Sequence, residues 1–276
     1  MPLYIQTNTA SMVAQNSLSK TQGMLGNSFQ RLSSGYRINS AADDAAGLGI
    51  SKSMEAQVRS FAVAERNAND GISMAQTADG AAEQVHGILT RLRELAVQGA
   101  NGTLSSNDSQ NLNTEFQALT GEVDRIANVI TFNGQNLLDA VATVTYQVGI
   151  NNSADNVISV TFGGANVSAL GLSLVSVSTV ADAQGALNTL DTAIQTLAQV
   201  RTRFGTAMNR LQGAVANLQS LQTNLSASLS RIRDADIAQE TSALARNQVL
   251  SQAGASILSQ ANQAPQLALS LLRGGG

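Results

Sequence analysis

Residues 187–232 have the sequence LNTLDTAIQTLAQVRTRFGTAMNRLQGAVANLQSLQTNLSASLSRI, and this stretch decides the fold of the chain. Apolar side chains recur along it at alternating steps of three and four, a spacing typical of a helix that packs against partner helices in a coiled coil. Only Arg201 interrupts the stripe with a polar side chain. The stretch predicts a helix of roughly 70 Å, at about 1.5 Å per residue, that needs partner helices. The apolar positions are Leu187, Leu190, Ile194, Leu197, Phe204, Met208, Leu211, Val215, Leu218, Leu225, Leu229 and Ile232.

Two upstream stripes with the same spacing supply those partners. The first ends at Gly99 before a polar loop at 101–108, and the second stops at Asn133 and Gly134. Short connections between long helices favour an antiparallel bundle. The first stripe comprises Ala68, Ile72, Ala75, Ala78, Ala82, Val85, Leu89, Leu92 and Ala96, and the second comprises Leu112, Phe116, Leu119, Val123, Ile126 and Ile130.

The composition agrees with long helices and leaves little room for strands. The 276 residues include only two prolines, Pro2 and Pro265, and aromatic residues make up 3% of the chain. Because proline breaks helix interiors, its absence from residues 3–264 permits long uninterrupted helices. Alternating β-branched residues occur only between about 140 and 180, where 144–148 and 157–162 flank a turn-rich segment and predict a hairpin. The predicted fold class is therefore mainly α: a long antiparallel coiled-coil helical bundle with a small β-hairpin region.

The two ends of the chain differ from its middle. Residues 1–42 and 241–276 contain five basic residues and no acidic residue, although the whole chain has a net charge of −3. Each end has a thin apolar stripe among Ser, Gln, Asn and Ala, too little to offset its ordering entropy alone. We therefore expect an N-terminal arm (1–43), a helical bundle (44–232) with the hairpin near 140–180, and a C-terminal arm (233–276), the arms becoming helical when assembled. The stripes are Leu18, Leu25, Phe29 and Leu32 in the first arm, and Ile237, Leu244, Leu250, Ile257, Leu258 and Ala261 in the second.

Catalytic and cofactor chemistry finds no support in the sequence. His86 is the only histidine and cysteine is absent, so neither a Ser-His-Asp arrangement nor a His or Cys metal cluster can form within one chain. The adjacent Asp43 and Asp44 point about 100° apart on a helix and favour capping or pairing between subunits. Gly47 and Gly49 lack the third glycine and preceding strand of a dinucleotide site. We expect no enzyme activity, no cofactor and no metal.

Nucleic acid, membrane and ordinary secretion are also disfavoured. Five basic residues over two long arms are too few for a nucleic-acid footprint, and no aromatic residues alternate with them to stack on bases. No apolar stretch is long enough to span a membrane, and the N-terminus has no charged start followed by an apolar run. These features alone would place the protein in the cytoplasm.

Four stretches identify a family instead. Residues 32–50 (LSSGYRINSAADDAAGLGI) closely resemble the N-terminal signature of bacterial flagellins, and so do 91–98 (RLRELAVQ), 131–134 (TFNG) and the tail at 260–272 (QANQAPQLALSLL), in the right order. The resemblance covers residues 1–140 and 180–272. The segment between residues 134 and 187 is too short for the outer domains of larger flagellins.

The resemblance implies a structural subunit that is exported unfolded and polymerises into the extracellular flagellar filament for motility. Its partners would be copies of itself, the flagellar type III export apparatus and an export chaperone, and the filament cap and hook-junction proteins. The arms would form the filament core, and Arg37, Asn39, Asp43 and Asp44 would connect the first arm to the bundle. The expected core residues of the arms are Leu18, Leu25, Phe29, Leu32, Ile257, Leu258, Leu267 and Leu269.

A recognition surface is expected on the bundle. The first upstream stripe leaves Ile88, Arg91 and Leu95 on a neighbouring helix face, and Glu115 of the next helix should complete the patch. In the family, residues matching Arg91, Leu95 and Glu115 are recognised by a host Toll-like flagellin receptor, although Thr90 stands where many receptor-active members have Gln. Alternatively, Leu95 widens the bundle seam and Glu115 is a solvated charge.

Two other functions remain open from the sequence. The hook-filament junction protein resembles flagellin at both ends, but it carries a proline-containing version of the segment at 40–46 and lacks the QLALSLL tail. A non-flagellar coiled-coil structural protein would satisfy the periodicity, but it would not need acid-free arms at both ends. A flagellin with a metalloprotease insert is excluded because the chain has no His-Glu-x-x-His.

Overall fold

The computed structural model describes residues 7–273, and their side chains from 7 to 263. Its long helices are α1 (Thr9–Ser34), α2 (Ala45–Gly99), α3 (Ser106–Val129), α4 (Val180–Arg233) and α5 (Ile237–Arg273). The strands are β1 (Thr131–Phe132), β2 (Gln135–Asn136), β3 (Ala142–Gln147) and β4 (Val157–Phe162). The chain divides into two compact units, a bundle unit (Gln57–Thr223) and an arm unit made of the described parts of Met1–Ala56 and Asn224–Gly276.

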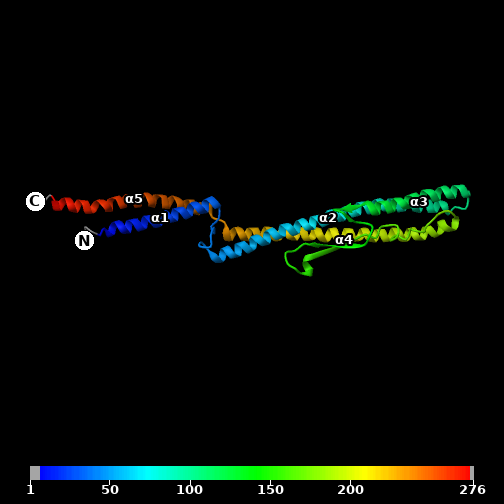
Figure 1. The fold of residues 1–276 in the computed structure, drawn as a ribbon, viewed down its shortest axis with the longest axis horizontal. Coiled ribbons are helices and arrows are strands. Elements are labelled where there is room, and N and C mark those ends of the chain that lie inside the picture. The colour runs from blue at the N-terminus through cyan, green and yellow to red at the C-terminus, as the bar shows by residue number, and fades with distance from the viewer. Residues whose placement is uncertain (1–6, 274–276) are drawn as a thin grey trace. The chain divides into compact units, whose positions relative to one another are not determined.

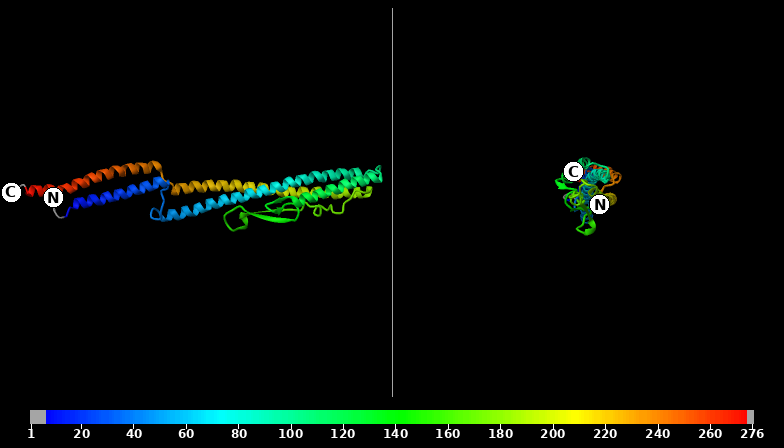
Figure 2. Two further views of the ribbon diagram at one scale, coloured as in Figure 1. Left: turned by 45° about the horizontal axis from the view of Figure 1, so that its top comes forward. Right: turned by 90° about the vertical axis from the view of Figure 1, so that its right-hand side faces the viewer.

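In the bundle unit, α2, α3 and α4 lie side by side around an apolar core (Figures 1 and 2). Arg93 of α2 pairs with Asp191 near the start of α4, whereas Glu65 accepts a hydrogen bond from Gln219 near its end, so the two helices are antiparallel. The stripes found in the sequence supply the core, including Leu92, Phe116, Leu197 and Phe204, which are fully buried. The predicted mainly α fold, with its antiparallel bundle, is confirmed.

The predicted hairpin is formed by β3 and β4. The strands pair antiparallel, with Tyr146 opposite Ile158, and β4 buries Ile158, Val160 and Phe162 on one face. The Phe162 and Phe204 rings lie 5.5 Å apart between centroids, and the Tyr146 hydroxyl donates a hydrogen bond to Met74 Sδ at 2.9 Å. Burial raises the pKa of Tyr146 to about 12. The alternation of apolar residues therefore correctly marked the face that packs on the helices.

A second, smaller hairpin was not predicted. Thr131 and Phe132 pair with Asn136 and Gln135 across a tight turn at Asn133 and Gly134, whose φ angles are 48° and 80°. Two successive positive φ angles are the mark of the hairpin turn that Asn-Gly favours. The sequence marked this Asn-Gly only as the end of a helix, because two-residue strands have no readable alternation.

The arm unit contains the antiparallel pair of α1 and α5. The Asn8 amide donates to the Ala261 carbonyl at 2.8 Å, and Arg31 lies 3.7 Å from Glu240 at the other end of the pair. No described helix is both long enough and apolar enough to cross a membrane.

Candidate functional site

The contact face between the two arms is made largely of small and polar residues. Thr21, Ser28 and Asn247 are buried there, at 8%, 4% and 8% exposure, and among the described residues of the pair they are the most buried. Of the predicted core residues, Leu18, Leu25, Leu32 and Leu258 are half-buried. Thr21 and Ser28 alternate with the leucines at steps of three and four, so they occupy the second position of the same heptad stripe. A search for apolar residues alone misses them because both are polar.

Several large apolar side chains of the arms are exposed rather than buried at the contact face. Phe29 is 51% exposed and Ile257 is 57% exposed. Val13 and Ile257 also line an open hollow of about 470 Å³ between α1 and α5. Exposed apolar side chains in such number on both helices favour an interaction with further partners. The other exposed large apolar side chains of α1 and α5 are Met12, Met24, Ile237, Val249 and Leu250.

Two predicted arm residues cannot be placed by their side chains. Leu267 and Leu269 fall within the bounds of α5, but they lie outside the residues whose side chains are described. Their role in the filament core stays a prediction.

The connector after α1 is held by carboxylate caps. Asp43 Oδ2 accepts hydrogen bonds from the backbone of Ser40 (2.8 Å) and Asn39 (3.2 Å) and from Ser40 Oγ (2.9 Å). These bonds lower the pKa of Asp43, and the bond from the Ser40 backbone has the largest effect. Asp44 accepts from the Gly47 backbone at 2.8 Å, at the start of α2. Of the two interpretations offered for this acidic pair, these bonds are those of capping, but the expectation that the pair lies on a helix is wrong, because Asp43 is in a turn and Asp44 directly precedes α2.

Arg37 joins the connector to the end of α4. Its backbone N–H donates to the Arg233 carbonyl at 2.7 Å, and its guanidinium donates to the Ile232 carbonyl. Arg233 in turn stacks on Tyr36, 3.8 Å from the ring centroid, and pairs with Glu55 at 3.3 Å. Sequence reasoning missed Tyr36, Glu55 and Arg233, because they come from three separate segments and share no spacing.

On the bundle unit, Arg91 and Glu115 lie together, as their spacing suggested. Arg91 Nε and Nη2 donate to Glu115 Oε1 at 3.1 and 2.8 Å, and Arg91 Nη1 donates to Glu94 at 3.0 Å. These bonds raise the pKa of Arg91, and the hydrogen bond with Glu115 has the largest effect. The Arg91 and Glu115 side chains are 50% and 45% exposed, so they form a surface network rather than part of the core.

The apolar residues expected beside Arg91 and Glu115, Ile88 and Leu95, are not exposed on that surface. Leu95 is 1% exposed inside the bundle core, and Ile88 is partly buried against it. The expectation that both lie outside the seam is therefore wrong, and the alternative that Leu95 widens the seam holds. The reason is that α2 is flanked by both α3 and α4, so its buried face is broader than a single stripe.

The described residues contain no group of three or more His, Cys, Asp or Glu side chains that could hold a metal ion. His86 lies half-buried on α2.

Comparisons with known proteins agree over nearly the whole chain. A family profile described as the bacterial flagellin N-terminal helical region matches residues 5–143, and one described as the bacterial flagellin C-terminal helical region matches 187–272. A flagellin of Halalkalibacterium halodurans is 41% identical over 274 residues, covering 98% of this chain and 100% of the relative. A flagellin of Bacillus subtilis is 40% identical over 304 residues, covering 98% and 99%.

Solved structures show the same likeness. The crystal structure of Bacillus cereus flagellin is 33% identical, with a TM-score of 0.50, and the match covers 59% of this chain and 94% of that one. A putative flagellar hook-associated protein from Vibrio parahaemolyticus has a TM-score of 0.58 over 70% of this chain and 100% of its own; at 14% identity that likeness concerns the fold alone.

Proposed function

This chain belongs to the bacterial flagellin family, and on this premise we propose that its arm unit is where neighbouring subunits order one another in the filament. The protein is a structural subunit that polymerises with copies of itself into the extracellular flagellar filament used for motility, and it is not an enzyme.

One observation carries the proposal for the arms. The α1–α5 pair buries polar side chains at its contact face and leaves Val13, Phe29, Val249 and Ile257 exposed. A helix pair with so few buried apolar groups does not offset the entropy of ordering its residues. Further subunits that cover these exposed apolar side chains would supply the missing burial, so folding of the arms would accompany assembly.

The domain division and the other partners are proposed on the same ground. We assign residues 1–43 and 233–276 to the arms of the filament core and residues 44–232 to the bundle. Arms that stay open before assembly suit export in an unfolded state through the type III apparatus, with a chaperone shielding their apolar side chains. The same arms would meet the cap and hook-junction proteins at the filament ends.

The test replaces an exposed apolar arm residue. Phe29→Ser should leave the helical signal of the monomer unchanged, and it should raise the subunit concentration needed for filaments after salting out by about tenfold. Gln30→Ser, at the neighbouring exposed position, is the matched control and should polymerise normally. Unimpaired filaments from a Phe29→Ser, Ile257→Ser double variant would contradict the role of the arms.

We propose further that the Arg91–Glu115 network is the surface contacted by the host Toll-like flagellin receptor, and that neighbouring subunits contact it in the filament. Two exposed, mutually paired charged side chains offer directional hydrogen bonds to a partner. Leu95, being buried, would act only by packing beneath them.

The test compares two exposed arginines that both form ion pairs. Arg91→Ala should weaken receptor signalling by free monomer at least tenfold and impair filament formation, because an interface Arg commonly costs well over about 1 kcal/mol when truncated. Among the described residues, Arg125 forms an ion pair only with Glu122 of its own helix, so Arg125→Ala should have neither effect. Full signalling by Arg91→Ala would contradict the receptor assignment. Normal filaments from this variant would contradict the proposal that neighbouring subunits contact the same surface.

A further inference from the structure

Leu174 is an apolar side chain held out from the bundle unit. It is 98% exposed, whereas Leu170, Leu172 and Val177 of the same loop are buried. Hydrogen bonds fix the loop on both sides of it: Val175 N–H donates to the Leu172 carbonyl at 3.2 Å, and the Gln117 amide donates to the Val175 carbonyl at 2.8 Å. Because the backbone of this loop is already fixed, little backbone conformational entropy is lost when a partner binds it.

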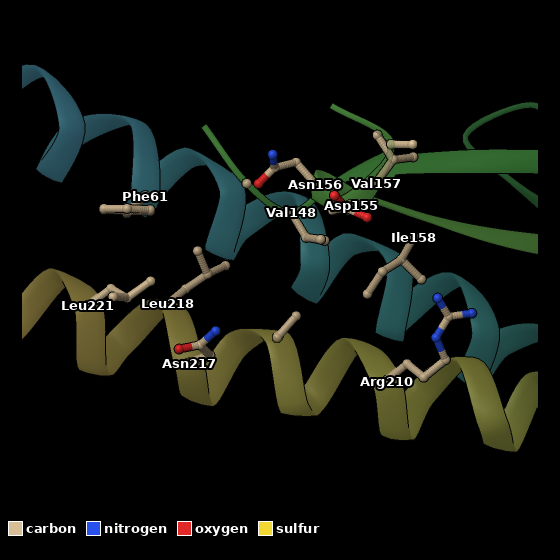
Figure 3. Close-up of a pocket in the computed structure, with 13 residues that line it drawn as sticks. Phe61, Val148, Asp155, Asn156, Val157, Ile158, Arg210, Asn217, Leu218 and Leu221 are labelled. Carbon is tan, nitrogen blue, oxygen red and sulfur yellow. The ribbon is translucent and has the colours of Figure 1, made fainter. Parts of the chain in front are cut away.

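A cavity that could receive such a side chain lies elsewhere on the same unit. It measures about 560 Å³ and is bounded by α2, α4 and the hairpin loop. Figure 3 shows Phe61, Leu218 and Leu221 gathered at one end of it, with Arg210 at the other. Leu221 is 43% exposed, so apolar surface in the cavity remains open to solvent.

The two features lie near opposite ends of the bundle unit. A Cβ added at Gly99 would lie 3.5 Å from Val177 Cβ, which places the loop of Leu174 at the C-terminal end of α2. Phe61 of the cavity lies near the other end of the unit, and α2 is roughly 57 Å long from Phe61 to Gly99 at about 1.5 Å per residue. Leu174 therefore cannot enter the cavity of its own subunit.

We propose that Leu174 of one subunit docks into the cavity lined by Phe61, Leu218 and Leu221 of the next subunit. A knob and a complementary pocket at different places on one molecule make a head-to-tail contact that does not close on itself, which is the geometry of an open filament. The inference rests on the filament role of the chain and adds a contact between bundle units to it.

Charge favours a second copy of this chain as the occupant. The cavity is lined by both Arg210 and Asp155, and the surrounding segments 57–66, 148–157 and 210–223 are weakly basic, with Arg59, Arg66 and Arg210 against Glu65 and Asp155. The loop end of the unit is acidic, so the two ends attract each other in a head-to-tail arrangement. Within 91–115 and 180–191 the carboxylates are Glu94, Asp108, Glu115, Asp182 and Asp191, against the guanidinium groups of Arg91 and Arg93.

Cross-linking tests the contact directly, because the natural chain has no cysteine. A Leu174→Cys, Asn217→Cys variant places one thiol on the knob and one at the cavity. Treating its filaments with a short bismaleimide should give a ladder of covalent multimers on a denaturing gel. The control Leu174→Cys, Gln195→Cys moves the second thiol along α4, away from the cavity, and should give no ladder. Filaments that yield no multimers above dimer from the first variant would overturn the proposal.

A pair of aspartate substitutions covers the case in which cysteine variants do not assemble. Leu174→Asp should raise the concentration needed to elongate unsubstituted seeds by about tenfold or more. Ser173→Asp adds the same charge at the adjacent exposed residue and should have little effect. Equal elongation by both variants would overturn the Leu174 contact and leave the filament role intact, whereas failure of the unsubstituted chain to polymerise would contradict the filament role itself.

Discussion

Arg201 shows how one polar side chain sits in an apolar seam. Its Nε donates to Asp79 on α2 at 2.9 Å, and its guanidinium also pairs with Glu83. These contacts raise the pKa of Arg201, and the hydrogen bond with Asp79 has the largest effect. The side chain is 31% exposed, so its stem covers the seam while its charged group reaches the edge. The side chain therefore reaches solvent at the edge of the seam and is paired there with two acidic residues of α2, rather than forming a buried ion pair.

Replacing Arg201 should therefore affect register more than stability. Partly exposed ion pairs contribute roughly 0–1 kcal/mol, so Arg201→Leu should change the free energy of unfolding by less than about 1 kcal/mol. Loss of the only polar position in the seam should permit alternative registers, seen as filaments of altered shape by electron microscopy. Arg203→Leu on the exposed side of α4 is the control. Wild-type filament shape from Arg201→Leu would refute register control.

Asp43 should give the connector a defined response to acid. Its folded-state pKa is depressed below the ordinary 3.8, so its stabilising bonds are fully present above that pH and are lost as pH falls through the depressed value. In a carboxyl NMR titration, Ser40→Ala should raise the pKa of Asp43 towards 3.8, because the variant removes the Ser40 Oγ hydrogen bond. An unchanged titration curve would show that this hydroxyl does not stabilise the carboxylate.

At the scale of the elements, replacing a glycine in a turn and one in a helix should have opposite effects on stability. Gly134 has φ +80° in the small hairpin, whereas Gly121 lies inside α3, and an added Cβ would meet nothing within 4 Å at either site. Gly134→Ala should destabilise the protein by about 1 kcal/mol through backbone strain. Gly121→Ala should stabilise it by about 0.5–1 kcal/mol. Urea midpoints with unchanged slopes would measure both, and shifts of the same sign would contradict this account.

The elements differed in how well the sequence predicted them. The stripes and the β3–β4 alternation were found because each repeats over many residues and averages out local exceptions. In α5, Ile257 is 57% exposed beside the open hollow between α1 and α5, whereas Asn247 is buried. Apolar character alone did not identify the contact face, because that face is largely polar.

For the whole molecule, the difference between the two units should appear in limited proteolysis of the monomer. The bundle unit has a continuous apolar core, whereas the described arm pair buries only Thr21, Ser28 and Asn247 below 9% exposure. Protease should remove residues up to about Asp43–Asp44 and from about Ile232 onward, leaving a fragment that contains the β3–β4 hairpin. Filaments, in which we propose that neighbouring subunits cover the arms, should resist the same treatment. Equal protection of arms and bundle in a verified monomer would contradict the proposal that the arms order on assembly.

The sequence by itself determined that this is an antiparallel helical bundle with one main hairpin, and its signatures pointed to a flagellin. Periodicity carries that information because helices and strands place side chains at fixed angular steps. Only the tertiary structure decided that Leu95 is buried, that Phe29 is exposed, and that Leu174 stands outside the bundle. Burial depends on how many neighbours surround an element and from which directions, and the spacing of residues along one chain does not contain those directions.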